Sequence, residues 1–434
     1  MAFRFSGGLK IEEHKELTES SPIEEFPSPE KVLIPLKQHA GAVLDPLVEK
    51  GDEVKAGDKI GDSKAFVSSP VHSSISGKVV AIEPCPIPTG EVVPAVVIEA
   101  YGDDPGGETI AEKRNWQDLK REDIVNMVRA AGIVGLGGAG FPTSVKLSPP
   151  EGTVIDTIIL NGAECEPFLT CDHRLMIESP EDIVTGLQII MKVVGAKQGI
   201  IGIEDNKKDA IETLTSKVKG SNITVVSLPT RYPQGSEKHL IKAILNREVP
   251  SGKLPLNVGV VVNNVQTAYS IKKAICEGIP LISRVITVSG DGVKKPGNFR
   301  VKIGTQFKDI LDYVGLKDGV KKVISGGPMT GVAQWSLDVP VIKATSGIIA
   351  LTEICEEQYP CLRCAKCVDA CPMGLLPLEL GNLAEQKRYD DAERLYALDC
   401  IECGSCAYIC PSRRPLVHLI RVAKSEINKK RRKV

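Results

Sequence analysis

The 434-residue sequence has few aromatic side chains, no excess of either charge and no long apolar run. Phe, Trp and Tyr make up 4% of the residues, which argues against a surface that stacks nucleic-acid bases. The 54 Lys and Arg residues nearly balance the 55 Asp and Glu residues, so no overall field selects nucleic acid or an acidic surface. No apolar run reaches the roughly 18–20 residues of a membrane span, and the N-terminus lacks a signal-peptide core. We therefore expect a cytoplasmic chain that meets a membrane only through partners.

Thirteen cysteines in such a chain point away from disulfides, because the cytosol keeps thiols reduced. Eight of them form two runs with the same spacing, each ending in a cysteine that precedes proline. The runs are Cys361, Cys364, Cys367, Cys371 and Cys400, Cys403, Cys406, Cys410. In two-cluster ferredoxins this spacing binds two [4Fe–4S] clusters, and the fourth cysteine of each run ligates the other cluster. The predicted ligand sets are therefore Cys361, Cys364, Cys367 and Cys410 for one cluster, and Cys400, Cys403, Cys406 and Cys371 for the other.

Two structural zinc sites are the alternative interpretation of these runs. Structural zinc prefers two ligand pairs in a closed tetrahedron and needs neither a third closely spaced cysteine nor a following proline. Zinc binding also does not explain why the same spacing occurs twice.

In the cluster interpretation, exchange of the fourth ligand would hold the two halves of the module together and bring the clusters close enough for electron transfer.

The pattern of apolar and turn-forming residues changes along the chain and predicts a multidomain α/β protein. Short Val- and Ile-rich strands indicate a small β-barrel or sandwich, and strands that alternate with helices indicate a parallel, doubly wound, Rossmann-like sheet. Residues 103–115 are typical of a linker. The predicted segments are an N-terminal arm (1–30), the barrel or sandwich (31–102), the α/β domain (118–280), a β-grasp type unit (281–352) and a helical ferredoxin-like module (353–434).

A glycine-rich loop, Gly135-Leu-Gly-Gly-Ala-Gly140-Phe-Pro-Thr, lies between a predicted helix and the first strand of the α/β domain, and Lys146 follows it. Glycines let backbone amides approach a phosphate closely, and a lysine can meet its negative charge. A glycine loop is equally often a simple turn. This loop precedes the strand, whereas the Rossmann fingerprint follows it, so both interpretations stay open.

Polar residues gather where the predicted strands end. They are Asn161-Gly-Ala-Glu164-Cys-Glu166-Pro, Tyr232-Pro-Gln-Gly-Ser-Glu237 and Asn263-Asn264-Val-Gln-Thr. Ligands of open α/β sheets bind at the carboxyl ends of strands. Asn161 offers a donor and an acceptor to a flavin ring edge, and the two acids can accept from amide or ribose hydroxyl groups. Each segment alone could be a solvated turn, but their convergence at one sheet edge predicts a site.

Taken in order, GLGGAGFPT with Lys146, NGAECEP with Asp172 and Arg174, YPQGSE and NNVQT resemble the NADH- and flavin-binding subunit of respiratory complex I. The whole layout of barrel-sandwich, flavin/NADH domain, β-grasp unit and dicluster module resembles the RnfC family of NADH:ferredoxin oxidoreductase subunits. This resemblance covers nearly the whole chain.

The resemblance implies two bound cofactors and a role for particular residues. NADH is implied near Gly135, Gly137, Gly138, Gly140 and Lys146. FMN is implied near Asn161, Glu164 and Asn264, and we count Glu166 and Asn263 with them. Glu237 is expected to face the nicotinamide, which makes Glu237 and Glu164 the candidate catalytic residues. The chain departs from the family pattern at Leu136, Ser144, Leu147, Ala163 and Ser236.

The implied function is a peripheral subunit at the cytoplasmic face of the cell inner membrane. It would exchange hydride between NADH and FMN and pass electrons singly through two [4Fe–4S] clusters to partners. The implied partners are an iron–sulfur subunit and integral membrane subunits of an ion-translocating complex. Two alternatives remain: an NADH-oxidising subunit of a soluble hydrogenase-type complex, and a non-catalytic electron-carrying adaptor.

Other residues receive simpler interpretations. The barrel segment resembles a lipoyl or biotinyl carrier with Lys64 near a hairpin tip, but carrier hairpins usually place hydrophobic or Met neighbours beside the lysine, so a docking platform is preferred. His72 is predicted to be a turn residue, and Cys165 and Cys171 to be packing residues. Cys355 lies outside the two runs that already supply eight ligands.

Overall fold

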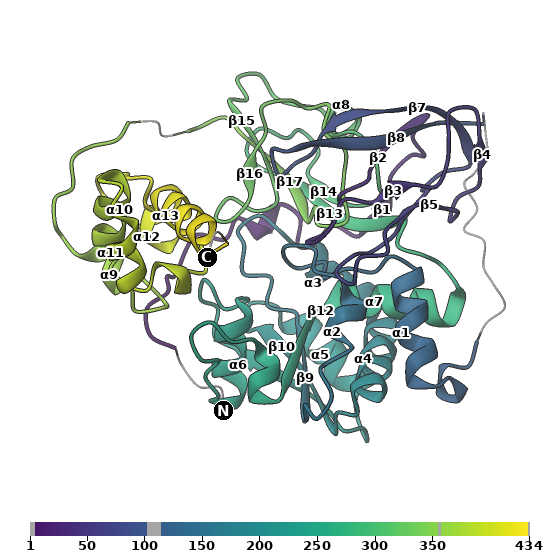
Figure 1. Ribbon diagram of the computed structural model, residues 1–434, viewed down its shortest axis with the longest axis horizontal. Coiled ribbons are helices and arrows are strands. Elements are labelled where there is room, and N and C mark those ends of the chain that lie inside the picture. Colours follow the sequence, from purple (N-terminus) through teal and green to yellow (C-terminus); the bar gives the residue numbers. More distant parts are fainter. Residues whose placement is uncertain (1–4, 102–113, 355–356, 433–434) are drawn as a thin grey trace.

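The computed structural model describes residues 5–101, 114–354 and 357–432. Of the predicted linker 103–115, only residues 114 and 115 are described, and Cys355 lies outside the described residues. Figure 1 shows a barrel and a mixed sheet above a parallel α/β domain, with a helical module beside them.

The N-terminal domain is built from two small antiparallel sheets, in agreement with the predicted barrel or sandwich. One sheet has the order β2-β8-β7-β4, and the other has the order β3-β5-β6. Alternate residues such as Val32 and Ile34 point into its core, as expected for strands with one buried face. The strands are β2 (Lys31–Pro35), β3 (Asp45–Pro46), β4 (Glu53–Val54), β5 (Lys59–Asp62), β6 (Val71–His72), β7 (Gly77–Pro86) and β8 (Val92–Ala100).

One prediction for this domain is wrong. His72 is not in a turn: it ends strand β6 and is buried at 6% exposure, and its Nδ1 has no hydrogen-bond partner among the described residues. The loop that carries the exposed Lys64 is fastened to the α/β domain, because Arg129 donates hydrogen bonds to Asp62 Oδ1 (2.9 Å) and to the carbonyl of Ser63 (2.8 Å).

The α/β domain has a four-stranded sheet, parallel throughout, in the order β11-β10-β9-β12. Both faces of the sheet are buried, which explains its unbroken apolar strands. In β9, Ile158 packs in the core that contains helices α4 and α7, while Ile159 packs against α6. The strands are β9 (Thr157–Asn161), β10 (Gln198–Glu204), β11 (Ile223–Leu228) and β12 (Val260–Asn264). The helices are α1 (Arg121–Ala130), α2 (Thr143–Lys146), α3 (Cys171–Glu178), α4 (Pro180–Val194), α5 (Lys208–Lys217), α6 (Glu237–Leu245) and α7 (Val265–Lys272).

The third domain is a mixed six-stranded sheet with one helix, in the order β1-β14-β13-β17-β15-β16. The predicted N-terminal arm takes part in it, because β1 (Ile23–Glu25) pairs in parallel with β14. The arm is therefore an edge strand of a domain whose other strands come much later in the chain. The other elements are β13 (Ser283–Ser289), β14 (Gly297–Lys302), α8 (Phe307–Val314), β15 (Lys322–Ser325), β16 (Val332–Ala333) and β17 (Gly347–Leu351).

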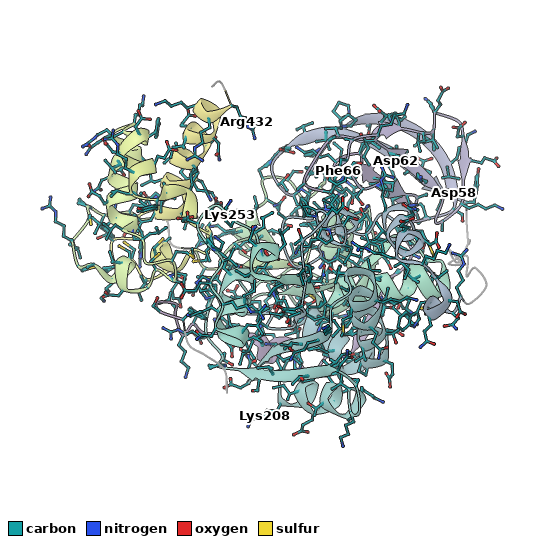
Figure 2. All side chains as sticks on the ribbon, turned by 60° about the horizontal axis from the view of Figure 1, so that its bottom comes forward. Asp58, Asp62, Phe66, Lys208, Lys253 and Arg432 are labelled. Atoms are coloured by element: carbon teal, nitrogen blue, oxygen red, sulfur yellow. The ribbon has the colours of Figure 1, made fainter. Side chains whose placement is uncertain are left out.

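The C-terminal module is helical and stands to one side of the other domains (Figure 2). Its core is a stripe of α13 residues, Ile420, Ala423 and Ile427, that packs on Leu380 and Leu383 of α10. The helices are α9 (Lys366–Asp369), α10 (Pro377–Glu385), α11 (Tyr389–Arg394), α12 (Ser405–Tyr408) and α13 (Leu416–Arg431). Among the helices of the described ranges, none combines the length and apolar character that crossing a bilayer requires.

Candidate cofactor cavity and cysteine-lined cavities

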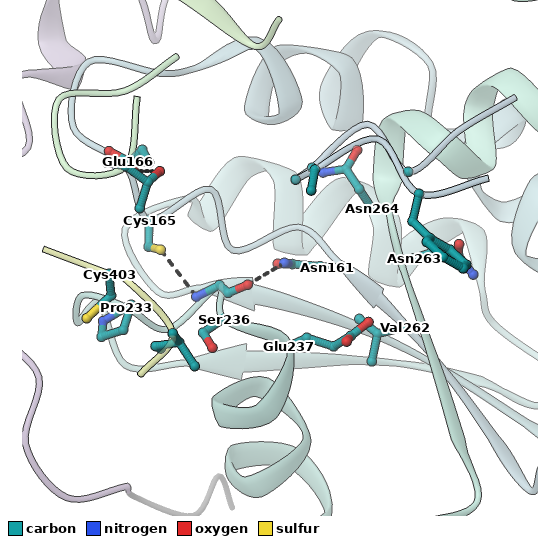
Figure 3. Close-up of a pocket in the computed structure, with 18 of the residues that line it drawn as sticks. Asn161, Cys165, Glu166, Pro233, Ser236, Glu237, Val262, Asn263, Asn264 and Cys403 are labelled. Atoms are coloured by element: carbon teal, nitrogen blue, oxygen red, sulfur yellow. Dashed lines mark hydrogen bonds between the residues drawn. The ribbon is translucent and has the colours of Figure 1, made fainter. Parts of the chain in front are cut away.

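Two adjoining cavities, of about 410 and 550 Å³, lie at the carboxyl edge of the parallel sheet. They share part of their walls, because both are bordered by Gly137, Gly138, Asn161, Glu166 and Asn264, among others. Figure 3 shows how residues of the strand ends β9 and β12 and of the loop before α6 surround the smaller cavity. The space is large enough for a nucleotide-sized ligand.

The glycine loop forms one wall of the cavity and leaves its backbone open to it. A side chain at Gly137 would place its Cβ 2.9 Å from Asn264, so only glycine allows this close approach. A Cβ at Gly138 would meet nothing within 4 Å. The loop is closed by the N–H of Gly135, which donates to the carbonyl of Phe141 (2.9 Å). These exposed amides fit a phosphate group.

Leu136, which departs from the family pattern, is buried in the main core at 1% exposure. Its N–H donates to Thr267 Oγ1 (3.0 Å) of α7, and its carbonyl accepts from Arg284 Nη2 (3.0 Å) of β13. The buried Arg284 borders the larger cavity, and its Nε has no partner among the described residues. The loop is thus held from two domains.

The three predicted asparagines all reach the cavity but differ in their partners. Asn161 donates to the carbonyl of Gly235 (2.7 Å), and Asn264 donates to Asp172 Oδ2 (2.6 Å). Asn263 is 3% exposed, and neither polar atom of its amide has a partner within the described residues. A buried amide without partners is costly, so this one fits a ligand that completes its hydrogen bonds.

The two acids of the β9 turn have partners within the protein. The Glu164 carboxylate accepts from the N–H groups of Asp172 (2.7 Å) and His173 (3.1 Å), at the N-terminus of α3. The Glu166 carboxylate accepts from the N–H groups of Met329 (3.0 Å) and Thr330 (2.9 Å), in the third domain. Both were predicted to hold amide or ribose hydroxyl groups of a ligand, whereas here they hold backbone amides.

Asp172 lies on the floor of the larger cavity. Burial, together with the charge of Glu164, raises the pKa of Asp172 to about 7. Ligand-type atoms of Glu164, Asp172 and Cys171 come within 4.8 Å of one another. Backbone and amide N–H groups already bind the two carboxylates. We therefore interpret these three residues as part of the cavity wall and not as metal ligands.

Lys146 and Glu237 form an ion pair in the wall of the smaller cavity. Lys146 Nζ donates to Glu237 Oε1 (2.8 Å) and to the carbonyl of Val262 (2.6 Å). Lys146 was predicted to meet a negative charge, and the charge that it meets here is the carboxylate predicted to face the nicotinamide. The pair joins the end of α2 to the start of α6.

Two smaller cavities, each of about 20 Å³, lie in the helical module, and each is bordered by four cysteines. One is lined by Cys361, Cys364, Cys367 and Cys410, and the other by Cys371, Cys400, Cys403 and Cys406. These are the two predicted sets, with the fourth cysteine of each run exchanged. Four thiols with apolar neighbours such as Leu378 and Val417 fit a [4Fe–4S] cluster.

The smaller cavity at the sheet edge, called the cofactor cavity from here on, shares part of its wall with the second of these cysteine-lined cavities. Ile401 and Cys403 border both. Tyr232 Oη, which is buried, donates to the carbonyl of Cys403 (2.6 Å), and His239 Nε2 lies 3.0 Å from the carbonyl of Pro372. The α/β domain therefore contacts this half of the helical module through two side chains, Tyr232 and His239.

Comparison with known proteins finds family models that match four stretches of the chain. Family models match for an RnfC barrel sandwich hybrid domain (3–103), a Nuo51 FMN-binding domain (128–273), an SLBB domain (285–333) and a 4Fe-4S dicluster domain (360–414). A subunit of the proton-translocating ferredoxin:NAD(+) oxidoreductase complex of Clostridium ljungdahlii is 49% identical, over 97% of this chain and 93% of its own length. A subunit of the Na(+)-translocating ferredoxin:NAD(+) oxidoreductase complex of Acetobacterium woodii is 48% identical, over 99% of this chain and 98% of its own. The chain belongs to the RnfC family.

The RnfC fold also has a relative among solved structures. A chain of an NAD+-reducing [NiFe]-hydrogenase in the H2-reduced state superposes with a TM-score of 0.50 over 72% of this chain and 63% of its own, at 18% identity. That likeness concerns the fold.

Most of the residues predicted to bind NADH or FMN meet in one place. All of them border the smaller cavity except Glu164, which borders only the larger one. Cys165, predicted to be a packing residue, also lines both cavities, and its Sγ accepts from the N–H of Gly235 (3.2 Å). Burial raises the pKa of the Cys165 thiol.

Some residues that line the cavities were not predicted as site residues from the sequence. Cys171, the other predicted packing residue, is buried and borders the larger cavity. Thr330 and Arg284 come from the third domain and carry no motif that points to the α/β domain. Tyr232 lies within the YPQGSE segment, which was a usable signal.

Proposed function

We propose that this chain is a peripheral subunit of an ion-translocating ferredoxin:NAD oxidoreductase complex. It exchanges hydride between NADH and FMN in the cofactor cavity and passes electrons singly through two [4Fe–4S] clusters. The names of the relatives in Clostridium ljungdahlii and Acetobacterium woodii support the reaction, and the FMN-binding and dicluster family models support the cofactors.

The observation that carries the proposal is the wall shared by the cofactor cavity and a four-cysteine cavity through Ile401 and Cys403. Nicotinamide exchanges two electrons together and a cluster exchanges one, and FMN supplies chemistry that does both. A cofactor cavity next to a cysteine-lined cavity is the arrangement that this conversion needs.

Residues of the chain have distinct tasks in this proposal. The open amides around Gly138 bind phosphate, and the unpartnered amide of Asn263 completes its hydrogen bonds on the bound cofactor. Glu237, held by Lys146, binds and orients the nicotinamide side of NADH. The Met329–Thr330 segment, held by Glu166, closes one side of the cavity against water.

The two clusters then have an order. The set with Cys371, Cys400, Cys403 and Cys406 adjoins the cofactor cavity. In the other set Cys364 is exposed, and the neighbouring Leu362 is 70% exposed. We infer that electrons are exchanged with the partner iron–sulfur subunit at that exposed face.

The proposal also includes the fold types of two domains and the location of the chain in the cell. The sheet order β11-β10-β9-β12 supports the doubly wound, Rossmann-like interpretation, and one helix on a mixed sheet supports the β-grasp interpretation. We propose that the chain binds integral membrane subunits at the cytoplasmic face of the cell inner membrane.

The test is an anaerobic reconstitution with iron, sulfide and FMN, followed by titration with NADH. We expect iron and sulfide near eight each per chain for two cubane clusters, one FMN, and bleaching first of flavin and then of cluster absorbance. Flavin that is bound but stays oxidised with NADH would contradict hydride exchange and favour the electron-carrying adaptor. Capture of a soluble hydrogenase instead of membrane subunits would favour the other alternative.

A further inference from the structure

Lys15, on the N-terminal arm, is a buried charged residue for which the proposed function gives no role. It begins the 3-10 turn η1 (Lys15–Leu17) and is 4% exposed. Its Nζ donates to three backbone carbonyls of the β9 turn, those of Glu164 (2.9 Å), Glu166 (2.9 Å) and Leu169 (2.6 Å). Three acceptors match the three N–H groups of an ammonium ion.

The segment that Lys15 binds has an unusual backbone. Glu164 and Phe168 have positive φ angles of 46° and 66°, a left-handed conformation that is unfavourable for residues other than glycine. The carbonyls of Glu164, Glu166 and Leu169 accept hydrogen bonds from Lys15, and they would lose this partner without it. Buried carbonyls without partners are costly, so one ammonium group stabilises the whole segment.

This segment also borders the cofactor cavities. Glu164, Cys165, Glu166 and Leu169 all line the larger one, and Figure 3 shows Cys165 and Glu166 beside the loop that carries Ser236. The carboxylate positions of Glu164 and Glu166 follow from the backbone that Lys15 holds. A change at Lys15 would therefore reach the cavity without a direct contact to the cofactor.

Lys15 belongs to a small buried group of charges behind the cavity. Lys207 Nζ donates to the carbonyl of Ala163 (2.8 Å) and lies 3.4 Å from Glu204 Oε2. Burial lowers the pKa of Lys15 and so does the charge of Lys207, whereas Glu164 raises it. The three carbonyl oxygens around Lys15 Nζ favour its charged form, and all three belong to the Glu164–Leu169 segment.

The arm is anchored on both sides of Lys15, so the ammonium group is delivered by a fixed segment. Before it, the N–H of Gly8 donates to the carbonyl of Ala370 (3.0 Å), and the N–H of Leu9 to that of Tyr232 (2.7 Å). After it, β1 pairs with β14. The arm thus connects the helical module, the α/β domain and the mixed sheet.

We propose that Lys15 is a positioning residue of the cofactor site, which holds the Glu164–Leu169 segment in its FMN-binding shape and places a positive charge behind the cavity. This inference rests on the proposed function, because it takes FMN as the ligand. Flavin gains negative charge on reduction, so a nearby buried cation favours the reduced form. Removal of the cation should lower the flavin midpoint potential.

Three variants separate the parts of this role. Lys15→Met keeps an unbranched side chain, one atom shorter, and removes the N–H donors and the charge. Lys15→Gln has the same length as the Met variant, keeps two N–H donors and removes the charge. Thr18→Val is the matched control, because Thr18 is buried on the same arm and its Oγ1 lies 2.7 Å from Thr170 Oγ1, and neither threonine is among the residues that line the two cavities. Two quantities are measured. The FMN dissociation constant comes from fluorescence quenching as FMN binds to the flavin-free chain, and the flavin midpoint potential comes from the FMN-bound chain.

We expect Lys15→Met to raise the FMN dissociation constant at least about tenfold. Lys15→Gln should raise it less but lower the midpoint potential, and Thr18→Val should change neither quantity. Lys15 variants that match the wild type in both quantities would overturn the role, as would an equal loss of FMN in Thr18→Val. If Lys15→Met does not fold, an unchanged potential in Lys15→Gln would overturn it. A wild-type chain that binds no FMN would instead overturn the proposed function itself.

Discussion

Lys146 Nζ lies 2.8 Å from Glu237 Oε1 in the wall of the cofactor cavity, although the two residues are 91 positions apart. Their side chains are 30% and 38% exposed, so water screens the pair and it adds at most about 1 kcal/mol to stability. The pair therefore serves the cavity more than the fold. It holds a carboxylate at a fixed place beside the open glycine loop.

We expect Glu237→Gln to slow flavin reduction by NADH about tenfold or more, since about 1.4 kcal/mol of lost transition-state stabilisation has that effect. The amide oxygen can still accept from Lys146, but the charge is gone. Stopped-flow absorbance of the flavin measures the rate, and urea unfolding should differ from the wild type by less than about 1 kcal/mol.

Lys146→Met and the double variant complete this test as a cycle. If the two residues act as a unit, the activation free energy of flavin reduction should rise less in the double variant than the sum of its rises in the two single variants. If the activation free energies lost in the two single variants add up to that lost in the double variant, Glu237 acts independently of Lys146.

A second prediction concerns Tyr232, whose hydroxyl group donates to the carbonyl of Cys403 (2.6 Å). Tyr232→Phe removes this bond and should destabilise the chain by about 1 kcal/mol. It should also slow electron transfer from flavin to cluster, because the cluster loop is released from the cavity wall, while flavin reduction by NADH keeps its rate. Stopped-flow traces at flavin and cluster wavelengths separate the two steps.

Tyr408→Phe is the control for this change. Tyr408 lies in the same module, but its side chain is 55% exposed. Equal slowing in both variants, or slowing of the flavin step in Tyr232→Phe, would contradict a role for the Tyr232 bond in the transfer step.

The exchange of the fourth cysteine gives a third prediction. Cys371→Ser should impair the cluster that adjoins the cofactor cavity, and Cys410→Ser should impair the exposed cluster. With NADH present, Cys410→Ser should still show one reduced cluster by electron paramagnetic resonance, whereas Cys371→Ser should show little cluster reduction because the first step is blocked.

Ligation within each run would give the reverse result. Cys371 would then belong with Cys361, Cys364 and Cys367, and its loss would leave the cluster beside the cavity reducible. The two serine variants have the same chemistry and spacing, so each serves as the control for the other.

The features that could be predicted from the sequence are those that depend on patterns of residues close together in the chain. The alternation of strands and helices from Arg121 onward depends on short spacings, and the structure has this alternation. The two cysteine runs also have short spacings, and each predicted set of four cysteines lines one cavity. The role of the arm could not be predicted, because Lys15 meets its partners about 150 residues away and no periodicity marks it. Glu166 shows the same limit, since its partner Thr330 comes from another domain.

The last prediction concerns pH and Asp172. In the folded chain the pKa of Asp172 is raised from 3.8 to about 7, first by burial and then by the charge of Glu164. Between these values the folded state binds more protons than the unfolded state, so the free energy of unfolding should fall as pH rises from about 4 to about 7. Above about 7 this contribution should be constant.

Asp172→Asn removes the titrating group and keeps an acceptor for Asn264 Nδ2, which lies 2.6 Å away. We expect the variant to lose this part of the pH dependence and to be more stable than the wild type at pH 7, by an amount on the order of 1 kcal/mol or more. Urea unfolding of the cofactor-free chain at several pH values measures the slope. Asp45→Asn, at an exposed site on β3, is the control and should keep the wild-type slope. An Asp172→Asn slope equal to that of the wild type between pH 4 and 7 would show that another buried group carries the titration.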